Sequence, residues 1–304
     1  MVKKPLSICI TGGKGGTGKT LVAVNLAIML KNKGYRVLLV DGDVENPNTY
    51  LLLKGKLKEY VEFPYFIPRI NEVKCSKCGI CAENCASNAL LHINNSIPIP
   101  MINLCSGCKL CFKICPEKAI EEDSKILGKI YSLSSNGVKL FVGELTTSEA
   151  RSAALVKGLL NETNKHIKSI EQVYDYIILD TAPGAHCDVE ELISNSDLVI
   201  PVTEPTRFGE LDLFRIIKLI ILLKKEYKVI INRSSLPGYK EKFYQELNNE
   251  QIEILGEIPL DEGILESYCN QSPFMENNEY GNNPAFKAFK EIYSNIMDWI
   301  GDKI

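Results

Sequence analysis

A glycine-rich loop near the N-terminus constrains the fold of this chain more than any other sequence feature. It follows an apolar strand predicted over residues 6–11 and precedes an apolar helix predicted over residues 20–33. Glycines at such a junction let backbone N–H groups turn toward a phosphate, and the helix N-terminus adds its dipole. The sequence therefore predicts a nucleotide-binding loop made of Gly12, Gly13, Lys14, Gly15, Gly16, Thr17, Gly18, Lys19 and Thr20.

Two side chains of this loop are expected to contact the nucleotide directly. Lys19 would pair with the β- and γ-phosphates of ATP, and the hydroxyl of Thr20 would bind Mg²⁺. The competing interpretation is a glycine-rich turn without a ligand. The position between a strand and a helix favours phosphate binding, because this context confirms the motif.

Strands and helices alternate over most of the chain. Strands are predicted over residues 6–11, 36–40, 176–180, 198–202, 228–232 and 253–258, and helices over residues 20–33, 148–160, 210–225, 239–248 and 284–300. The strands are nearly continuous apolar runs, which indicates a parallel sheet covered by helices on both faces. A hairpin is predicted over residues 126–145, with Asn136 and Gly137 in its turn. The predicted fold class is α/β.

One segment interrupts this alternation. From about residue 59 to residue 122 the chain is rich in proline and cysteine and has little helical periodicity. The predicted organisation is the first part of a P-loop domain over residues 1–58, an inserted module over 59–123, and the second part of the P-loop domain over 124–304. The sheet would then form one discontinuous domain, with the module inserted after its second strand.

Eight of the eleven cysteines lie between positions 75 and 115, in two sets with the same internal spacing. Without a signal-peptide core, such spacing points to metal binding and not to disulfides. The spacing resembles that of bacterial two-cluster ferredoxins, in which the fourth cysteine of each set binds the other cluster. The predicted ligands are Cys75, Cys78, Cys81 and Cys115 for one [4Fe–4S] cluster, and Cys85, Cys105, Cys108 and Cys111 for the second. The module would accordingly be a bacterial-ferredoxin-like α+β unit.

Zinc is the alternative metal for these cysteines. Structural zinc sites usually use paired C-x₂-C units separated by a longer loop. Here three cysteines are evenly spaced and a fourth follows, which favours iron–sulfur clusters. Ala86 stands where the ferredoxin pattern usually has proline, whereas Pro116 follows the second set as expected. Residue 86 would shape a turn and is not a ligand, so both clusters remain predicted.

The first lysine of the glycine-rich loop points to a family. The run from Lys14 to Thr20 resembles the deviant Walker A motif of the MinD/ParA/nitrogenase-iron-protein class, a SIMIBI-type group of P-loop ATPases. In that class the early lysine reaches across a dimer interface to the partner's nucleotide, where another cation stabilises charge on the γ-phosphate. The resemblance implies a nucleotide-dependent homodimer and catalytic roles for Lys14 and Lys19.

Other landmarks of the class match in order over residues 1–50 and about 140–304. Asp43 resembles the switch I aspartate that orients the attacking water, and Asp180 begins a segment that resembles Walker B followed by switch II. The resemblance implies catalytic roles for these two aspartates and, together with Thr20, a role at Mg²⁺. It also implies nucleotide contacts, mainly to the base, by Asn232, Arg233, Pro259 and Asp261.

Three cysteines lie outside the module. Cys9 is expected to be a small core residue, and no role is predicted for Cys269. Cys187 stands seven residues after Asp180, an offset at which the nitrogenase iron protein uses a cysteine to bridge a cluster across its dimer. No second ligand of that kind is found here, so an ordinary thiol is favoured. His186 beside it is expected to be an exposed loop residue.

Composition argues against several classes of partner. The formal net charge is −3, with no basic stripe, so no nucleic-acid partner is expected. No apolar run reaches the length of about 18 residues that a membrane span needs. The C-terminal helix has balanced charges, whereas a membrane-surface helix would have a basic polar face. We expect a cytoplasmic protein without a membrane anchor.

The ATPase landmarks and the cysteine module together resemble MinD-superfamily P-loop ATPases with an inserted ferredoxin domain. The leading hypothesis is an ATPase that couples nucleotide-dependent change to electron transfer through two clusters, toward an unidentified redox or cofactor-accepting protein. One alternative is an iron–sulfur or metal cofactor carrier of the Mrp/ApbC type, although the C-x-x-C pair of that branch is absent here. A third hypothesis is a positioning or partition ATPase with redox-sensing clusters.

Overall fold

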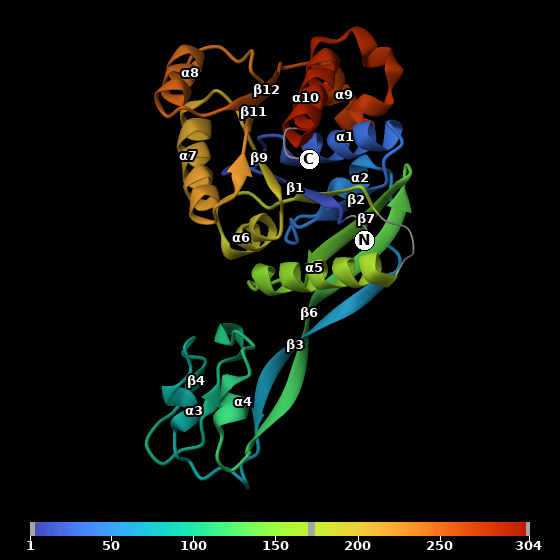
Figure 1. Ribbon diagram of the computed structural model, residues 1–304. Coiled ribbons are helices and arrows are strands. Elements are labelled where there is room, and N and C mark those ends of the chain that lie inside the picture. Colours follow the sequence, from blue (N-terminus) through green and yellow to red (C-terminus); the bar gives the residue numbers. More distant parts are fainter. Residues whose placement is uncertain (1–3, 170–173, 302–304) are drawn as a thin grey trace. The chain divides into compact units, whose positions relative to one another are not determined.

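The computed structural model describes residues 4–169 and 174–301 and divides into two compact units (Figure 1). The first unit consists of Met1–Val61, Ile130–Glu144 and Ser152–Ile304, and the second of Glu62–Lys129 and Leu145–Arg151. The outermost residues of the predicted ranges 1–58 and 124–304 lie outside the described residues. The predicted ranges divide the chain in a similar way, but the structure adds Leu145–Arg151 to the unit that carries the cysteines.

A long sheet forms the centre of the first unit, and the last two strands in its order, residues 120–135 and 60–70, belong largely to the second unit. The strands of this sheet are β1 (Leu6–Thr11), β2 (Val37–Asp41), β3 (Tyr60–Ile70), β6 (Ile120–Ser135), β7 (Val138–Leu145), β8 (Tyr176–Asp180), β9 (Leu198–Thr203), β10 (Glu226–Tyr227), β11 (Val229–Asn232) and β12 (Ile254–Ile258). Their order is β12-β11-β9-β1-β8-β2-β7-β6-β3, with β10 beside β9. The pairs from β12 to β7 are parallel. The predicted parallel α/β sheet is therefore confirmed.

Helices cover both faces of this sheet. They are α1 (Lys19–Asn32), α2 (Thr49–Leu52), α5 (Ser152–Ser169), α6 (Cys187–Ser194), α7 (Arg207–Leu222), α8 (Lys240–Asn249), α9 (Glu262–Cys269) and α10 (Pro284–Gly301), with 3₁₀ turns at Phe274–Glu276 and Asn278–Asn282. In Figure 1, α1 and α10 lie on one side of the sheet, and α5 and α6 on the other. Ile8 and Ile10 pack with α1, and Cys9 between them is also fully buried. The central strand is thus buried on both faces, as its apolar sequence predicts.

The parallel register aligns residues that are far apart in the sequence. In β1 and β8, Ile10 lies opposite Asp180, and in β2 and β8, Asp41 lies opposite Asp180. All three strands end at the same edge of the sheet, which is where open α/β sheets bind ligands.

Several elements of the first unit differ from the sequence predictions. The structure contains α2, α6, α9 and the short strand β10 outside the predicted ranges, and α5 begins at Ser152 and not near residue 148. The late start has a local cause, because Ser148 has a left-handed φ of +70°. A helix needs a right-handed backbone, so it cannot include this residue.

The second unit carries the cysteines on short elements. These are α3 (Ile80–Glu83), β4 (Leu90–Leu91), β5 (Ile99–Pro100), a 3₁₀ turn at Ile102–Leu104 and α4 (Leu110–Ile114). Its apolar cluster is small and is built around Cys81, Leu90 and Ile120. A core of this size contributes little stability, and small modules usually need a disulfide or a metal to stay folded.

The strand β3 was not predicted, because Pro64 and Pro68 make the segment a poor candidate for a central strand. The structure accommodates both prolines, since β3 is the last strand in the order of the sheet. An edge strand needs hydrogen-bond donors on one side only.

The return segment Leu145–Arg151 contacts the rest of the second unit through Arg151, which an ion pair within the segment holds in place. Arg151 and Glu149 form this pair, with side chains that are 12% and 5% exposed. The guanidinium lies 4.9 Å from the centre of the Tyr65 ring and donates to the carbonyl oxygen of Ile102 at 3.3 Å. These contacts explain why the segment belongs with the cysteines and not with α5.

The terminal helix α10 packs on the sheet as predicted. Its buried residues form one stripe and include Phe286, Phe289, Ile292, Ile296, Trp299 and Ile300. In the described part of the chain, no helix is long and apolar enough to cross a membrane.

Phe274 anchors the turn that joins α9 to α10, and its replacement tests the core of the first unit. The ring is fully buried, and its centre lies 5.0 Å from that of Tyr280 and 5.9 Å from that of Phe286. We expect Phe274→Ala to lower the free energy of unfolding by about 3–5 kcal/mol. Urea unfolding followed by the fluorescence of Trp299, the only tryptophan, would report on this unit. The exposed residue Phe208 supplies the control, because Phe208→Ala should change stability by less than about 0.5 kcal/mol.

Candidate nucleotide site and cysteine hollows

The glycine-rich loop connects β1 to α1 and has little room for side chains. Gly18 has a φ of +101°, and a Cβ atom there would lie 2.3 Å from Nδ2 of Asn232. That same nitrogen donates to the carbonyl oxygen of Thr17 at 2.8 Å, so Asn232 supports the loop directly. A Cβ at Gly13 would lie 2.3 Å from the backbone oxygen of Asp212 in α7. The loop is therefore held in close backbone contact with its neighbours.

A cavity of about 500 Å³ opens beside this loop. Most of the predicted nucleotide-binding residues line it: Gly15, Gly16, Gly18, Lys19, Thr20, Asp43, Asn232, Arg233, Pro259 and Asp261. The other lining residues are Leu21, Asn46, Asn48, Pro183, Leu260, Ile264, Leu265 and Tyr268. The lining does not include Gly13, Lys14 and Thr17, which belong to the loop, or Asp180 beside it.

The predicted Mg²⁺ residues come together at the strand ends. The hydroxyl of Thr20 donates to Oδ2 of Asp180 at 2.7 Å. Among the described residues, Oδ1 of Asp180 has no hydrogen-bond partner, although it is buried. Burial and the neighbouring Asp41 raise the pKa of Asp180 well above its ordinary value. A buried carboxylate oxygen without a partner fits a cation or its water shell, so these residues suit Mg²⁺.

Asp41 is a member of this acidic group that the sequence reading did not assign to the site. Its Oδ2 accepts hydrogen bonds from the backbone N–H of Asn48 and from both the N–H and the hydroxyl of Thr49. Burial raises the pKa of Asp41 to about 6, despite these hydrogen bonds. Burial likewise raises the pKa of Asp43, the predicted switch I aspartate. The strand-end position of Asp41 was visible in the sequence, but its nearness to Asp180 follows only from the register of β2 and β8.

The two lysines of the loop point to different partners. The side chain of Lys19 is buried and donates from Nζ to the carbonyl oxygen of Lys14 at 3.1 Å. Burial lowers the pKa of Lys19, an effect that Asp180 and Asp43 oppose. Lys14 itself reaches Glu204, with 3.0 Å between Nζ and Oε1. Glu204 also holds Arg233, one of the predicted base-contacting residues.

The far side of the cavity is apolar and comes largely from α9. Leu260, Leu265 and Tyr268 line the cavity and are each more than half exposed. Asp261 lies among them, but Oδ1 caps α9 through the N–H of Gly263 at 2.8 Å and accepts from Asn283 at 2.9 Å. The Asp261 carboxylate is therefore already engaged, and the apolar side chains offer the larger surface to a base. Leu265 and Tyr268 lie in α9, for which the sequence analysis gives no range.

The eight module cysteines line two small hollows within the second unit. Cys75, Cys78, Cys81 and Cys115 line the first, and Cys85, Cys105, Cys108 and Cys111 line the second. The hollows are similar in size and small, with about 20 Å³ each beside the 500 Å³ of the nucleotide cavity. Each fourth cysteine thus lies with the opposite set, which is the crossed arrangement that the spacing predicts.

The two hollows share further details. The backbone N–H of Ala89 donates to Sγ of Cys85 at 3.2 Å, and that of Ala119 donates to Sγ of Cys115 at the same distance. N–H donors beside sulfur stabilise the thiolate form, which is the form that binds metal. Burial raises the pKa of Cys111 to about 11, so this thiol is poorly solvated as a free thiolate.

The arrangement of the cysteine sulfur atoms bears on the choice between zinc and [4Fe–4S] clusters. Within residues 4–169 and 174–301, no group of three or more histidine, cysteine or acidic side chains converges on a point that could hold one metal ion. A [4Fe–4S] cluster has four iron atoms, and each cysteine binds a different one. Its ligands therefore surround a larger body and need not converge. Four cysteines around each hollow fit this requirement.

The three cysteines outside the second unit lie on three different elements of the first unit. Cys9 is buried in β1, where burial raises its pKa. Cys187 is the first residue of α6 and Cys269 the last residue of α9, and both are exposed. His186 is the N-cap residue of α6.

Comparison with known proteins places this geometry in a family. An uncharacterized protein of Methanocaldococcus jannaschii is 34% identical over 276 residues, which cover 90% of this chain and 93% of that protein. An iron–sulfur cluster carrier protein of Pyrococcus furiosus is 22% identical, over 96% of this chain and 85% of that protein. The structure of the septum site-determining protein MinD of Pyrococcus horikoshii, complexed with Mg-ADP, matches 99% of both chains with a TM-score of 0.59 and 18% identity, so it shares the fold. The model of the CobQ/CobB/MinD/ParA nucleotide-binding domain matches residues 8–274, and the chain therefore belongs to that family.

Proposed function

We propose that this protein binds and hydrolyses ATP and couples the resulting conformational change to electron transfer through two [4Fe–4S] clusters. The observation that carries the proposal is the crossed lining of two hollows by four cysteines each, in a chain of a nucleotide-binding family. The alternative of an ATPase without redox chemistry leaves this arrangement of eight cysteines unexplained.

The nucleotide half of the proposal uses the residues around the large cavity. The β- and γ-phosphates lie along the glycine-rich loop, where Lys19 and the N-terminus of α1 neutralise their charge. Thr20 and Asp180 hold Mg²⁺ and its water shell. Asp43 orients the attacking water, and the products are ADP and phosphate. The base lies against the apolar side chains of α9.

Lys14 has a separate role in this proposal, which includes a nucleotide-dependent homodimer. Its side chain is 42% exposed and does not line the cavity of its own chain, within the described residues. A cation in that position can serve a nucleotide bound by a second copy, as the resemblance to the deviant Walker A class implies. There it would stabilise charge that develops on the γ-phosphate.

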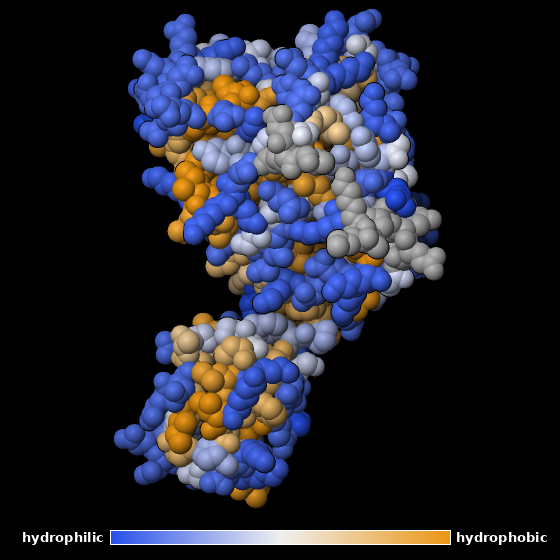
Figure 2. Space-filling model, in the orientation of Figure 1, coloured by the Kyte–Doolittle hydropathy of each residue, from blue (hydrophilic) through white to orange (hydrophobic). Residues whose placement is uncertain are grey.

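The cysteines of the second unit hold the clusters, which supply one-electron transfer when they are bound. With clusters bound, the unit would take one electron at a time from a low-potential donor protein and pass it to an acceptor protein. Cys78 and Cys108, one from each ligand set, are exposed, so both sites lie close to the surface. Figure 2 shows apolar side chains around α3, β4 and α4, whose exposed residues include Ile80, Leu91, Leu110 and Phe112. Such a surface suits the docking of a protein partner.

Coupling between the two activities is expected from the path of the chain. Asp43 follows β2, and only α2 separates it from β3, along which the chain enters the second unit. The chain first returns to the first unit along β6, passes through the second unit again at Leu145–Arg151, and then continues into α5. A change in the loop that contains Asp43 can therefore reach the cysteine unit through a short covalent connection.

The test measures cluster reduction as a function of nucleotide. Protein purified without oxygen would be mixed with a limiting amount of reduced ferredoxin, and cluster bleaching would be followed by stopped-flow absorbance. We expect the rate to differ at least about threefold between Mg-ATP, Mg-ADP and no nucleotide, because coupling energies are usually about 1–3 kcal/mol. Lys19→Ala is the control, since it should keep both clusters and lose the response. Equal rates under all conditions would refute the coupling.

A carrier of iron–sulfur clusters is the second candidate, favoured by the likeness to the Pyrococcus furiosus protein of that name. Here Cys187 and Cys269 would have to replace the missing C-x-x-C pair. Iron analysis separates the two functions. A labile cluster beyond those of the eight module cysteines, lost in Cys187→Ala, would favour the carrier.

A further inference from the structure

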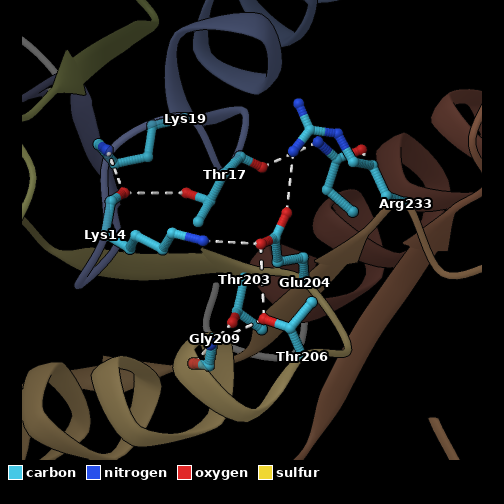
Figure 3. A network of polar contacts seen from close by, with 9 residues as sticks. Lys14, Thr17, Lys19, Thr203, Glu204, Thr206, Gly209 and Arg233 are labelled. Carbon is cyan, nitrogen blue, oxygen red and sulfur yellow. Dashed lines mark hydrogen bonds and ion pairs between the residues drawn. The ribbon is translucent and has the colours of Figure 1, made fainter. Parts of the chain in front are cut away.

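Glu204 is a buried acidic residue for which the proposed function has no role. It directly follows β9 and precedes the cap of α7. Oε1 accepts from Nζ of Lys14 at 3.0 Å and from the hydroxyl of Thr206 at 3.4 Å, and Oε2 accepts from Nη1 of Arg233 at 2.8 Å (Figure 3). One carboxylate thus joins the glycine-rich loop, the start of α7 and the segment after β11.

Electrostatics favours the ionised form of this residue. Burial alone would raise the pKa of Glu204, but hydrogen bonds from Lys14 and Arg233 hold it below its ordinary range. A buried carboxylate that lost all its partners would be strongly destabilising. With two cations, Glu204 can release one and still keep the other. Arg233 therefore allows Lys14 to leave without stranding a buried charge.

The turn that carries Glu204 is held firmly against the loop. The hydroxyl of Thr206 accepts from the N–H of Gly209 at 3.0 Å, and the hydroxyl of Thr203 donates to the carbonyl oxygen of Gly209 at 3.0 Å (Figure 3). A Cβ atom on Gly13 would collide with the backbone of α7. The carboxylate thus has a fixed position relative to the backbone of Lys14, and only the lysine side chain is free to move.

The two basic side chains that bind Glu204 differ in their position relative to the nucleotide cavity. Arg233 lines the cavity on the side of Pro259 and Asp261, whereas Lys14 lies outside the lining that the described residues form. A nucleotide therefore meets one cation of the pair directly. The other is exposed to a second molecule that approaches this face, since 42% of its side chain is accessible.

We propose that Glu204 is a positioning residue that holds Lys14 within its own chain and releases it only when the phosphate of a second copy competes for it. This inference rests on the proposed function, in which Lys14 serves a partner's nucleotide. The anchored state keeps the isolated molecule from self-association, because Lys14 must break its ion pair to cross the interface. Arg233 remains on Glu204 after release and neutralises it.

The first measurement is nucleotide-dependent self-association. Sedimentation of Glu204→Gln with a non-hydrolysable ATP analogue and Mg²⁺ should give an association constant about threefold to tenfold above that of the wild type, because glutamine retains the shape but loses the charge. At low protein concentration, kcat should rise, because hydrolysis in the proposed mechanism needs the dimer. Glu204→Asp keeps the charge and should behave more like the wild type.

A double-mutant comparison separates this role from a merely structural one. In a Lys14→Ala background, Glu204→Gln should have no further effect on self-association, because the group that it releases is absent. A gain that persists without Lys14 would overturn the proposal, and so would weaker association of Glu204→Gln than of the wild type.

A second measurement tests the ion pair without any dimer. Lys14 should react with acetic anhydride about threefold faster in Glu204→Gln than in the wild type, as quantified by peptide mass spectrometry, since a partly exposed pair gives modest protection. Equal labelling would refute the contact. A wild type that never associates with nucleotide would instead refute the proposed dimeric function, so the two failures appear in different measurements.

Discussion

Exchange of Asp180 for asparagine is expected to stabilise the nucleotide-free protein while it abolishes the Mg²⁺-dependent binding of ATP. Asp180 is fully buried beside Asp41, and one of its oxygens has no partner among the described residues. Asparagine has the same shape and removes one of the clustered charges. Removal of a buried carboxylate charge that lies beside a second carboxylate should raise the free energy of unfolding by about 1–3 kcal/mol. Loss of the charged ligand should weaken Mg-ATP binding by at least about tenfold.

The stability gain should depend on pH in a definite direction. Because the pKa of Asp180 is raised in the folded state, the folded protein binds its proton more tightly than the unfolded chain does. The wild type therefore loses stability as the pH rises from the ordinary value of 3.8 through the raised value. Asp180→Asn lacks this loss, so its advantage should grow with pH. Thermal unfolding between pH 5 and pH 8 without nucleotide would measure it.

Two results would contradict this interpretation of Asp180. A destabilised Asp180→Asn variant would mean that the carboxylate is structurally needed without its cation. Unchanged stabilisation by Mg-ATP, measured as the rise in Tm on adding the nucleotide, would mean that Asp180 does not serve the bound metal. Asp197→Asn supplies a contrast, since the pKa of Asp197 is lowered by hydrogen bonds from Ser7 and Lys4 despite burial. That variant should be less stable than the wild type at neutral pH.

The second prediction concerns the crossed cysteines and uses pairs of substitutions. Cys78→Ser removes a ligand of the first cluster and should reduce the iron content from about eight to about four atoms per chain. Addition of Cys115→Ser should cause no further loss, because both cysteines line the same hollow. Addition of Cys85→Ser to Cys78→Ser should instead bring the iron content close to zero, because Cys85 lines the other hollow. Iron and sulfide analysis after anaerobic purification would measure this.

The two double variants distinguish crossed from uncrossed binding of the fourth cysteine. If the fourth cysteine served its own set, the Cys78 and Cys85 pair would keep about four iron atoms and the Cys78 and Cys115 pair would lose all of them. Zinc in place of iron in the purified protein would contradict both clusters. Cys269→Ser is the matched control, because this exposed cysteine ends α9 outside both hollows and should leave the iron content unchanged.

Local motifs were the part of the molecule that could be predicted from the sequence. The glycine-rich loop depends on backbone freedom between one strand and one helix, so its residues are adjacent in the chain. Gly18 shows this, because its left-handed φ and its closeness to Asn232 both require glycine. The cysteine spacing is likewise a local pattern. Its crossed assignment remains a prediction for the clusters themselves, although the cysteines do line the two hollows in those sets.

The residues that the sequence did not reveal depend on contacts between distant segments. Asp41 joins the acidic group only because β2 lies beside β8, and Glu204 meets Lys14 only because β9 lies beside β1. No spacing rule connects positions that are more than a hundred residues apart. Tyr268 and Leu265 were missed for a different reason, since α9 is short and these two residues line the cavity and are more than half exposed.

The prolines of β3 have a consequence for the behaviour of the protein at high concentration. An edge strand normally offers N–H groups to which a strand of another molecule can add, and this is a common start of aggregation. Pro64 and Pro68 each remove one such group from the last strand of the sheet. The sheet is thereby protected from growing into an intermolecular assembly on this side. Variants that replace these prolines with valine for the sake of a more regular strand would expose the protein to fibril-like association.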